Sequence, residues 1–412
     1  MKTLWKKGAA AVLALAMLLS GCGGSESSNG GRTLSDGSGS SFGGRTVSES
    51  AGGSASGRMP SERGGLPSAS APAVPHDRSG SVVPVGEEYM TNIEVSKNAD
   101  GALRAVRYVF AMDTEMMLEA YGENAGAAVE AASGEVLRID QLLSVGIGTS
   151  DICRLNREGT AKVSEDAREL IRRGIEVGGS VGGAFDITVY PLMEAWGFTN
   201  GTYRVPEAAE IAELLSNMGA DKVAVDGNTV RLSEGTKIDL GGIAKGYTSG
   251  RLMEIFSSYG VDAALVSLGG NVQTYGKKTN GENWRIAIQD PEKSGKYLGV
   301  LSCHDLAVIT SGGYERYFEE DGTTYHHILD PANGRPANAG LRSVTVVSRD
   351  GTLADALSTS LYVLGSEKAA AYWKEHSGDF GYILEKDDGT LLVTDNLADS
   401  FSTERKIEVV SR

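Results

Sequence analysis

The sequence predicts an α+β fold, with one domain of mixed sheets and helices that follows an N-terminal segment without a folded pattern. Apolar residues recur at helical spacing in some stretches and form short β-branched runs in others, and the two kinds alternate irregularly. The hydrophobic fraction is 41% over 412 residues, which is enough for a large core. Residues 23–86 contribute almost nothing to this pattern. We therefore expect the folded domain to span residues 87–412.

The charge and the cysteine spacing exclude two function classes. The chain has 39 Lys and Arg against 54 Asp and Glu, a net charge of −15. General nucleic-acid binding needs basic patches, so we expect no nucleic-acid partner. The three cysteines, Cys22, Cys153 and Cys303, form no C-x-x-C pair, which argues against a structural zinc site.

The first 21 residues have the pattern of a signal peptide. Three lysines in the first seven residues precede an apolar run, residues 8–19, which is too short to span a membrane. Leu19-Ser20-Gly21-Cys22 follows and resembles a bacterial lipobox, in which the cysteine is lipidated and becomes the mature N-terminus. We expect Cys22 to anchor the protein on the extracytoplasmic side of the cell membrane. An ordinary signal peptide with a chance cysteine is the alternative.

Residues 22–86 are rich in Gly, Ser, Pro and Arg and are predicted to form a flexible tether. Their few apolar side chains cannot offset the entropy lost on ordering. In an oxidising compartment Cys153 and Cys303 could form a disulfide. Two separate buried thiols are the alternative.

The first half of the domain is predicted from its periodicity. Strand formers fill residues 103–119, and an apolar stripe at helical spacing predicts a helix over 123–143. Residues 150–156 are predicted as a loop. Ser164, followed by acidic residues, predicts the start of a helix over 164–177.

Four glycines in residues 178–183 predict an unusual backbone turn or a close approach to a ligand. A short apolar turn or helix is expected at 191–198 and a helix at 206–218. Residues 223–232 are predicted to form a hairpin around Asp226-Gly227-Asn228.

The stretch from Lys237 to Tyr247 has the pattern of a short strand that ends at Asp239, a glycine turn at 241–242 and a helix that ends near Gly260. Adjacent glycines let the backbone approach a ligand, and a helix N-terminus with a nearby Lys245 suits phosphate. The spacing is neither G-x-G-x-x-G nor a Walker loop. A plain strand–turn–helix corner would have the same pattern.

The second half alternates strands with a long helical segment. A helix is expected at 352–364, followed by another that carries Trp373. Two strands are expected to close the chain around 387–389. The other strands are predicted at 263–268, 284–288, 299–303, 306–310 and 341–347.

Four glycine-rich turns lie beside a polar residue, which predicts that they line a ligand cleft. The turns are 178–183, 241–242, 269–270 and 312–313, and their polar neighbours are Asp186, Asp239, Asn271 and Arg316.

Asp355 and Thr359 lie four residues apart on a predicted helix and share one face. Both offer oxygen, which suits Mg²⁺. The alternative is that Asp355 only meets the helix dipole and Thr359 only packs. His326 and His327 could act as metal ligands, as a general base or as simple strand residues. Neighbouring strand residues face opposite sides, so they do not both serve one site.

Eight motifs in this order resemble the ApbE family of flavin transferases (FAD:protein FMN transferases), over nearly the whole chain from about Ala105 onward. The motifs are Met112-Asp113-Thr114, Gly183-Ala184-Phe185-Asp186-Ile187-Thr188-Val189-Tyr190-Pro191-Leu192, Asp239-Leu240-Gly241-Gly242-Ile243-Ala244-Lys245-Gly246-Tyr247, Leu268-Gly269-Gly270-Asn271, Trp284-Arg285-Ile286-Ala287-Ile288-Gln289-Asp290-Pro291, Thr310-Ser311-Gly312-Gly313-Tyr314-Glu315-Arg316, His326-His327-Ile328-Leu329-Asp330-Pro331 and Ala354-Asp355-Ala356-Leu357-Ser358-Thr359. Many members of the family are extracytoplasmic lipoproteins, which agrees with the lipobox.

The resemblance implies two sets of site residues. The FAD contacts it implies are Met112, Ala184, Phe185, Asp186, Asp239, Lys245 and Ile328. The Mg²⁺ ligands it implies are Asp355, Thr359 and the backbone carbonyl of Gly242. Asp355 is then also a catalytic residue, and His327 is our candidate for handling the proton of the attacking hydroxyl, because an unperturbed histidine titrates near neutrality.

Two positions depart from the family pattern. Many members carry an aromatic residue where this chain has Gly146, so a stacking partner for the flavin or the adenine is missing there. The family's Ser-Gly-Asp-Tyr is Ser311-Gly312-Gly313-Tyr314 in this chain. The acid at position 313 is therefore absent.

The reaction that the resemblance implies moves FMN from FAD onto a Ser or Thr hydroxyl of an extracytoplasmic acceptor protein and releases AMP, with Mg²⁺ as cofactor. One alternative is a hydrolase that splits FAD into FMN and AMP with water. Others are a lipoprotein that only binds FAD and one that binds a sugar or a peptide.

Overall fold

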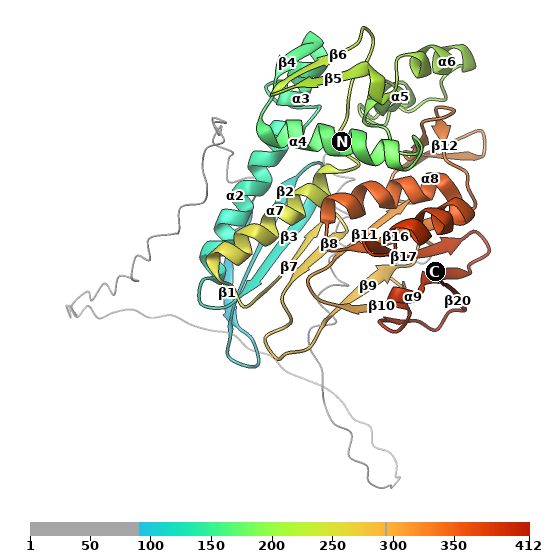
Figure 1. The fold of residues 1–412 in the computed structure, drawn as a ribbon. Coiled ribbons are helices and arrows are strands. Elements are labelled where there is room, and N and C mark those ends of the chain that lie inside the picture. Colours follow the sequence, from blue (N-terminus) through green and yellow to red (C-terminus); the bar gives the residue numbers. More distant parts are fainter. Residues whose placement is uncertain (1–89, 293–294) are drawn as a thin grey trace, which may run out of the picture. The chain divides into compact units, whose positions relative to one another are not determined.

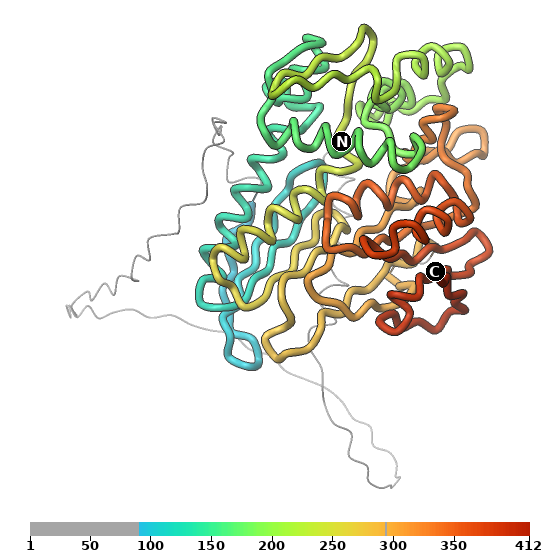
Figure 2. Tube along the Cα trace, in the orientation of Figure 1, coloured from blue at the N-terminus to red at the C-terminus, as the bar shows by residue number. Residues whose placement is uncertain are grey.

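The computed structural model describes residues 90–292 and 295–412. The predicted signal peptide, Cys22, the whole tether and residues 87–89 of the predicted domain lie outside the described residues. Figure 1 shows one large sheet with helices on one face, and Figure 2 shows the path of the chain in the same orientation.

The large sheet has ten strands in the order β1-β2-β3-β7-β8-β11-β16-β17-β18-β20. All neighbouring pairs are antiparallel except β18 and β20, which run parallel. Its strands are β1 (Glu94–Lys97), β2 (Leu103–Ala111), β3 (Thr114–Tyr121), β7 (Ala263–Leu268), β8 (Asn271–Tyr275), β11 (Ala307–Gly312), β16 (Leu341–Ser348), β17 (Phe380–Lys386), β18 (Leu391–Thr394) and β20 (Ile407–Val410).

Three long helices cover one face of this sheet (Figure 1). They are α2 (Ala125–Leu143), α7 (Ala244–Tyr259) and α8 (Gly351–His376). The apolar stripe of α2 is buried as its spacing predicted, with Ala128, Val129, Ala132, Val136 and Ile139 at 0% exposure.

A three-stranded sheet packs through its own apolar core against the large sheet, where Trp284 and Leu301 share a cluster with Val308 and Ile383. The order of this sheet is β19-β10-β9. The strands are β9 (Trp284–Gln289), β10 (Tyr297–Cys303) and β19 (Phe401–Ser402).

The remaining elements form smaller units. One is a sheet in the order β4-β6-β5 with helices α3 and α4, and another is the hairpin β12–β13. The elements are α3 (Asp151–Glu158), β4 (Thr160–Lys162), α4 (Glu165–Ser180), η3 (Ile187–Val189), α5 (Tyr190–Trp196), α6 (Ala208–Ser216), η4 (Ala220–Lys222), β5 (Val223–Asp226), β6 (Thr229–Leu232), β12 (Tyr317–Glu320), β13 (Thr323–His326), β14 (Leu329–Asp330), β15 (Arg335–Pro336) and α9 (Asp395–Ala398).

Most of the predicted elements are confirmed. Ser164 accepts a hydrogen bond from the Ala167 N–H and so caps α4. The long segment from Gly351 to His376 contains Gly365 at φ 77° and ψ 171°, so it is two helices, as the sequence predicted.

The strand formers of residues 103–119 lie in two strands, because the chain reverses at Met112-Asp113. Two predicted elements are wrong. Residues 150–156 lie mostly in a helix, which Ser150 caps by accepting from the Cys153 N–H. No strand precedes Asp239, because the Ile238 N–H donates to the Asn156 side chain and the Asp239 N–H donates to the Ile187 carbonyl.

Cys153 and Cys303 are two separate free thiols, of which Cys303 is buried and Cys153 is partly exposed. Within residues 90–292 and 295–412, the helices are too short or too polar for any of them to cross a membrane.

Candidate active site

The turns β2–β3 and β7–β8 lie side by side at one end of the large sheet. Met112 and Asp113 both have positive φ, 49° and 59°, and so make a tight two-residue turn without a glycine. A Cβ on Gly269 would lie 2.6 Å from Thr114 Cγ2. Met112 and the Gly269-Gly270 turn therefore belong to the same region.

Asp355 joins three elements at this region. Its side chain is 4% exposed. Oδ2 accepts from the Gly246 N–H at 2.8 Å, and Oδ1 accepts from Asn271 Nδ2 at 2.9 Å. The ammonium of Lys245 lies 3.9 Å from Oδ1. One carboxylate thus connects the first turn of α7, the start of β8 and α8.

The close approach of α7 and α8 depends on Gly246. A Cβ there would lie 2.1 Å from the Gly351 carbonyl oxygen and 2.6 Å from Asp355 Cβ. Because the Gly246 N–H bonds to Asp355, it does not bond to the carbonyl four residues earlier, that of Gly242. No donor among the described residues reaches that carbonyl oxygen, which leaves it open to a ligand.

The turn after α4 brings Phe185 against the same stretch. Gly182 and Gly183 have φ of 63° and 84°, and a Cβ on Gly242 would lie 3.0 Å from Phe185 Cε2. Ala184 and Phe185 are buried. The carboxylate of Asp186 accepts from the Thr188 N–H at 2.8 Å and from its hydroxyl at 2.6 Å, and so begins η3.

Asp239 lies partly exposed before the glycine turn and accepts from the Gly241 N–H at 2.8 Å. The surrounding protein raises the pKa of this carboxyl, and the positive charges of Arg316 and Lys245 oppose that rise. Asp239 therefore lies close enough to Arg316 and Lys245 for their positive charges to act on its carboxyl group.

The turn after β11 is fixed to α8. The Ser311 hydroxyl lies 2.7 Å from Ser358 Oγ and 3.4 Å from Thr359 Oγ1. Arg316, on the same turn, donates to the Phe198 carbonyl. The four predicted glycine turns thus gather around Asp355 and Gly242.

His327 lies beside this turn, with Nδ1 at 3.2 Å from the Arg316 carbonyl oxygen. A carbonyl accepts only, so Nδ1 carries the proton and Nε2 keeps its lone pair. The protein atoms around the ring lower the pKa of His327 to about 3, and the charge of Arg316 adds to this effect. The imidazole is therefore neutral at physiological pH.

We expect His327 to make the protein less stable as the pH falls. The unfolded chain binds a proton at this histidine below its ordinary value of 6.5, whereas the folded chain binds one only near pH 3. Folding stability is lost progressively through that window. Urea unfolding of wild type and His327→Gln at pH 7 and pH 5 should show a smaller loss for the variant. Equal losses would contradict the assignment.

The structure places every predicted site residue in one region of the fold. Ile328 follows His327, is 5% exposed and accepts from the Ala337 N–H. Sequence reasoning placed Asn271 at the rim of the cleft but did not predict its hydrogen bond to Asp355, and it gave no role to Glu315. The signal for Asn271 was its place directly after the Gly269-Gly270 turn.

The two departures from the family pattern have different surroundings. A Cβ on Gly146 would meet only Ser144 Oγ, at 3.7 Å, so a larger side chain has room there. A Cβ on Gly313 would lie 2.7 Å from His326 Cδ2 and 2.9 Å from the Tyr362 hydroxyl. The ring of His326 is held by contact with Tyr362 and by the Ala337 carbonyl.

Gly313→Asp is expected to destabilise the fold by about 1–3 kcal/mol, because the new side chain overpacks against the fixed ring of His326. Gly148→Asp is the matched control, since a Cβ there meets nothing within 4 Å. Thermal unfolding of both variants measures the difference. Equal melting temperatures would mean that the chain accommodates the family's acid at position 313.

Among residues 90–292 and 295–412, no group of three or more His, Cys, Asp and Glu side chains is placed to hold a metal.

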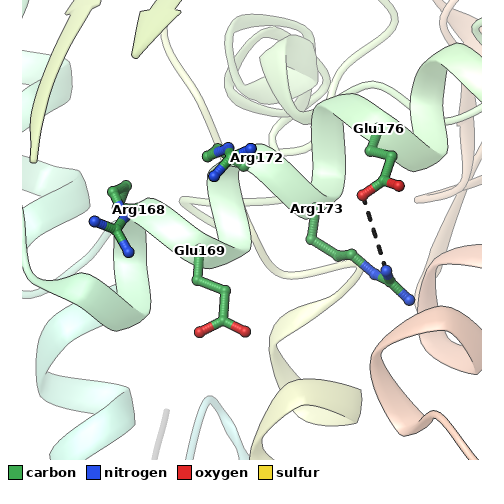
Figure 3. A pocket seen from close by; sticks show the side chains of 5 residues that line it. All are labelled: Arg168, Glu169, Arg172, Arg173 and Glu176. Atoms are coloured by element: carbon green, nitrogen blue, oxygen red, sulfur yellow. Dashed lines mark ion pairs between the residues drawn. The ribbon is translucent and has the colours of Figure 1, made fainter. Parts of the chain in front are cut away.

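A surface hollow lies apart from the predicted site. Figure 3 shows that charged side chains of α4 line it, and Arg173 and Glu176 form an ion pair there at 3.8 Å. None of the predicted site residues lines it.

Comparisons with known proteins connect this site to a family. A sequence profile described as the ApbE family matches residues 112–384. A FAD:protein FMN transferase of Treponema pallidum (strain Nichols) is 33% identical over 282 residues, which cover 63% of this chain and 78% of the relative. One of Klebsiella pneumoniae (strain 342) is 35% identical over 243 residues, which cover 57% of this chain and 75% of the relative.

Solved structures agree with the sequence matches. The crystal structure of the ApbE protein from Thermotoga maritima MSB8 has a TM-score of 0.69 and 32% identity, and the match covers 74% of this chain and all of that one (100%). The apo form of the Pseudomonas stutzeri flavinyl transferase ApbE has a TM-score of 0.65 and 27% identity, with coverages of 77% and 99%. The mixed α+β fold expected from the sequence is thus confirmed, and the chain belongs to the ApbE family.

Proposed function

We propose that this protein transfers the FMN part of FAD onto a Ser or Thr hydroxyl of an acceptor protein and releases AMP, with Mg²⁺ as cofactor. The observation that carries the proposal is the junction at Asp355. There a buried carboxylate, the first turn of α7 and the Lys245 ammonium meet within hydrogen-bond or ion-pair distance. Relatives at about a third identity carry the name FAD:protein FMN transferase, which supports this reading.

The oxygen atoms at the junction fit a hard divalent cation. Asp355 supplies a carboxylate, Thr359 a hydroxyl and Gly242 a carbonyl without a donor among the described residues. This set contains one acidic side chain, which is consistent with the absence of a larger His, Cys, Asp and Glu cluster in residues 90–292 and 295–412. When bound there, Mg²⁺ would offset the negative charge that gathers on the diphosphate and on the leaving AMP.

The residues of the chain itself bind and orient FAD in this proposal. Lys245 pairs with the diphosphate, and the N-terminal turn of α7 adds the positive end of its dipole. Phe185 packs against Gly242 and so supports the glycine turn at 241–242. Met112, Ala184, Asp186, Asp239 and Ile328 contact the rest of FAD.

The reaction exchanges one P–O bond for another and releases the proton of the acceptor hydroxyl. The acceptor hydroxyl oxygen attacks the phosphorus on the FMN side of the diphosphate, and the bond to the AMP oxygen breaks. His327 is neutral and offers Nε2 as an acceptor, so it can orient the hydroxyl by accepting its hydrogen bond.

We also propose that the protein works outside the cytoplasm, anchored to the cell membrane through a lipidated Cys22. The lipobox-like Leu19-Ser20-Gly21-Cys22 and the polar segment after it support this placement. The acceptor protein then lies on the same side of the membrane. Metabolic labelling with a fatty acid tests the anchor, and a Cys22→Ala variant should lose both the label and the membrane fraction.

The test of the function is incubation with FAD, Mg²⁺ and an extracytoplasmic acceptor that carries a family-type Thr motif. Covalent flavin fluorescence on the acceptor in a denaturing gel, together with released AMP, supports the transferase. Free FMN and AMP without labelled acceptor would instead identify a hydrolase. Unchanged FAD that co-purifies with the protein would identify a binding protein, and absence of any flavin affinity would contradict all three.

A further inference from the structure

A buried carboxylate, Asp166, joins α4 to the first turn of α7. Asp166 lies in the first turn of α4, and its exposed fraction is 0%. Its Oδ1 accepts a hydrogen bond from the Tyr247 hydroxyl at 2.6 Å, and its Oδ2 lies 3.0 Å from Arg138 Nη1 on α2. Both oxygens of this carboxylate are therefore engaged by side chains of other helices.

Two more charged residues extend this cluster. Glu135 accepts from Arg138 Nε at 2.7 Å and from Arg138 Nη2 at 2.8 Å. Arg251 Nε lies 3.5 Å from Glu135 Oε1. Because Arg251 follows Tyr247 by four residues, the two side chains leave the same face of α7. The cluster therefore holds α7 by one face of its first two turns.

The first turn of α7 depends on such contacts, because the residue at its N-cap position is an isoleucine, whose side chain cannot accept a hydrogen bond. Two adjacent residues attach the turn to other helices. The Gly246 N–H donates to Asp355 on α8, and the Tyr247 hydroxyl donates to Asp166 on α4. Lys245 directly precedes these two residues, so its position follows from both attachments.

α4 also supports the other end of the stretch 241–247. The segment after α4 carries Phe185, and a Cβ on Gly242 would lie 3.0 Å from Cε2 of its ring. This segment packs closely on the end of α4, where a Cβ on Gly178 would lie 2.5 Å from the Phe185 carbonyl oxygen. One helix therefore fixes the glycine turn through Phe185 and the first turn of α7 through Asp166.

We propose that Asp166 and Tyr247 are positioning residues of the FAD site, and that their hydrogen bond holds the first turn of α7 so that Lys245 and the N-terminal end of the helix face the diphosphate. The proposal deepens the transferase function proposed above and rests on it. Tyr247 is 7% exposed, so its hydroxyl acts through the backbone that carries it and not by contact with FAD.

The first test compares Tyr247→Phe with wild type on the full-length protein, with FAD, Mg²⁺ and the acceptor protein. Phenylalanine keeps the buried ring and removes the hydroxyl, so the core stays filled. A displacement of about 1 Å in a substrate-positioning group costs up to about 10²-fold, and we expect the KM for FAD to rise about tenfold or more. The KM for the acceptor protein should stay unchanged, which a general loss of structure would not give.

Tyr382→Phe is the matched control. Tyr382 is fully buried, and its hydroxyl has no hydrogen-bond partner among residues 90–292 and 295–412. The same substitution there should leave the KM for FAD unchanged. At the other end of the hydrogen bond, Asp166→Asn keeps an oxygen that can accept from Tyr247, so it should bind FAD more tightly than Asp166→Ala.

A double-mutant cycle with Lys245→Ala tests whether Tyr247 acts by placing Lys245. In that background the loss of the Tyr247 hydroxyl should raise the KM for FAD by a smaller factor than in wild type. Equal factors in the two backgrounds would overturn the proposal, and so would a wild-type KM for FAD in Tyr247→Phe.

The affinity for FAD, measured from the quenching of flavin fluorescence, separates this proposal from the proposed function. A wild-type protein that binds FAD but labels no acceptor would overturn the transferase, and the FAD affinities of the same variants would still test the roles of Asp166 and Tyr247. A wild-type protein that does not bind FAD would overturn both.

Discussion

Asp355→Asn is expected to lower the rate of FMN transfer by about 10²–10⁴-fold, the loss that follows when several kcal/mol of charge stabilisation are removed from a transition state. Asp355 is the only acidic side chain among the three proposed oxygen donors for Mg²⁺. The substitution also leaves the Lys245 ammonium without the carboxylate that lies 3.9 Å away. Both effects act on the phosphates and not on the core.

The amide should preserve the local fold. Its oxygen can still accept from the Gly246 N–H, and Asn271 can turn its own amide so that its oxygen faces the new NH₂ group. We therefore expect a melting temperature close to that of the wild type. Glu367→Gln removes a charge from an exposed position in the part of α8 that follows Gly365, and it should leave the transfer rate and the melting temperature unchanged.

Metal binding separates this prediction from a general loss of activity. Titration of Mn²⁺ into the protein without FAD, followed by electron paramagnetic resonance, should show weaker binding for Asp355→Asn than for wild type. If the variant keeps full metal-dependent turnover, the metal assignment is wrong. Loss of turnover with unchanged metal affinity would place Asp355 at the substrate and not at the metal.

The sequence predicted the core elements where one signal dominated. The apolar stripe of α2, the Ser164 cap of α4 and the hairpin over Val223–Asp226 and Thr229–Leu232 each follow from local pattern or turn chemistry. The β2–β3 turn carried no such signal. Met112 and Asp113 adopt left-handed φ without a glycine, so no residue type marked where the run of strand formers reverses.

The separate parts of the site could be predicted from the sequence, whereas the contacts between them could not. The glycine turn and Asp355 could each be singled out from residue type and spacing. Their direct bond, from the Gly246 N–H to Asp355, spans 109 residues and depends on how α7 and α8 pack. The bond between Asn271 and Asp355 could not be predicted for the same reason, since the two residues lie on different elements.

Gly246→Ala is expected to destabilise the protein by about 2–4 kcal/mol, although alanine favours a helix over glycine by about 1 kcal/mol. The added Cβ would lie 2.1 Å from the Gly351 carbonyl oxygen, and backbone on both sides cannot move aside as a flexible side chain would. The helices must separate, which lengthens the bond between the Gly246 N–H and Asp355 and disrupts the site.

Gly250→Ala is the matched control for this close approach. It lies four residues further along α7, where a Cβ meets nothing within 4 Å, so alanine should stabilise the protein by about 0.5–1 kcal/mol. Urea unfolding should therefore move the two variants in opposite directions from wild type, and only Gly246→Ala should lose FMN transfer. If both alanines stabilise the protein, the contact between the N-terminal turn of α7 and α8 is looser than 2.1 Å implies, and Asp355 is not held by that turn.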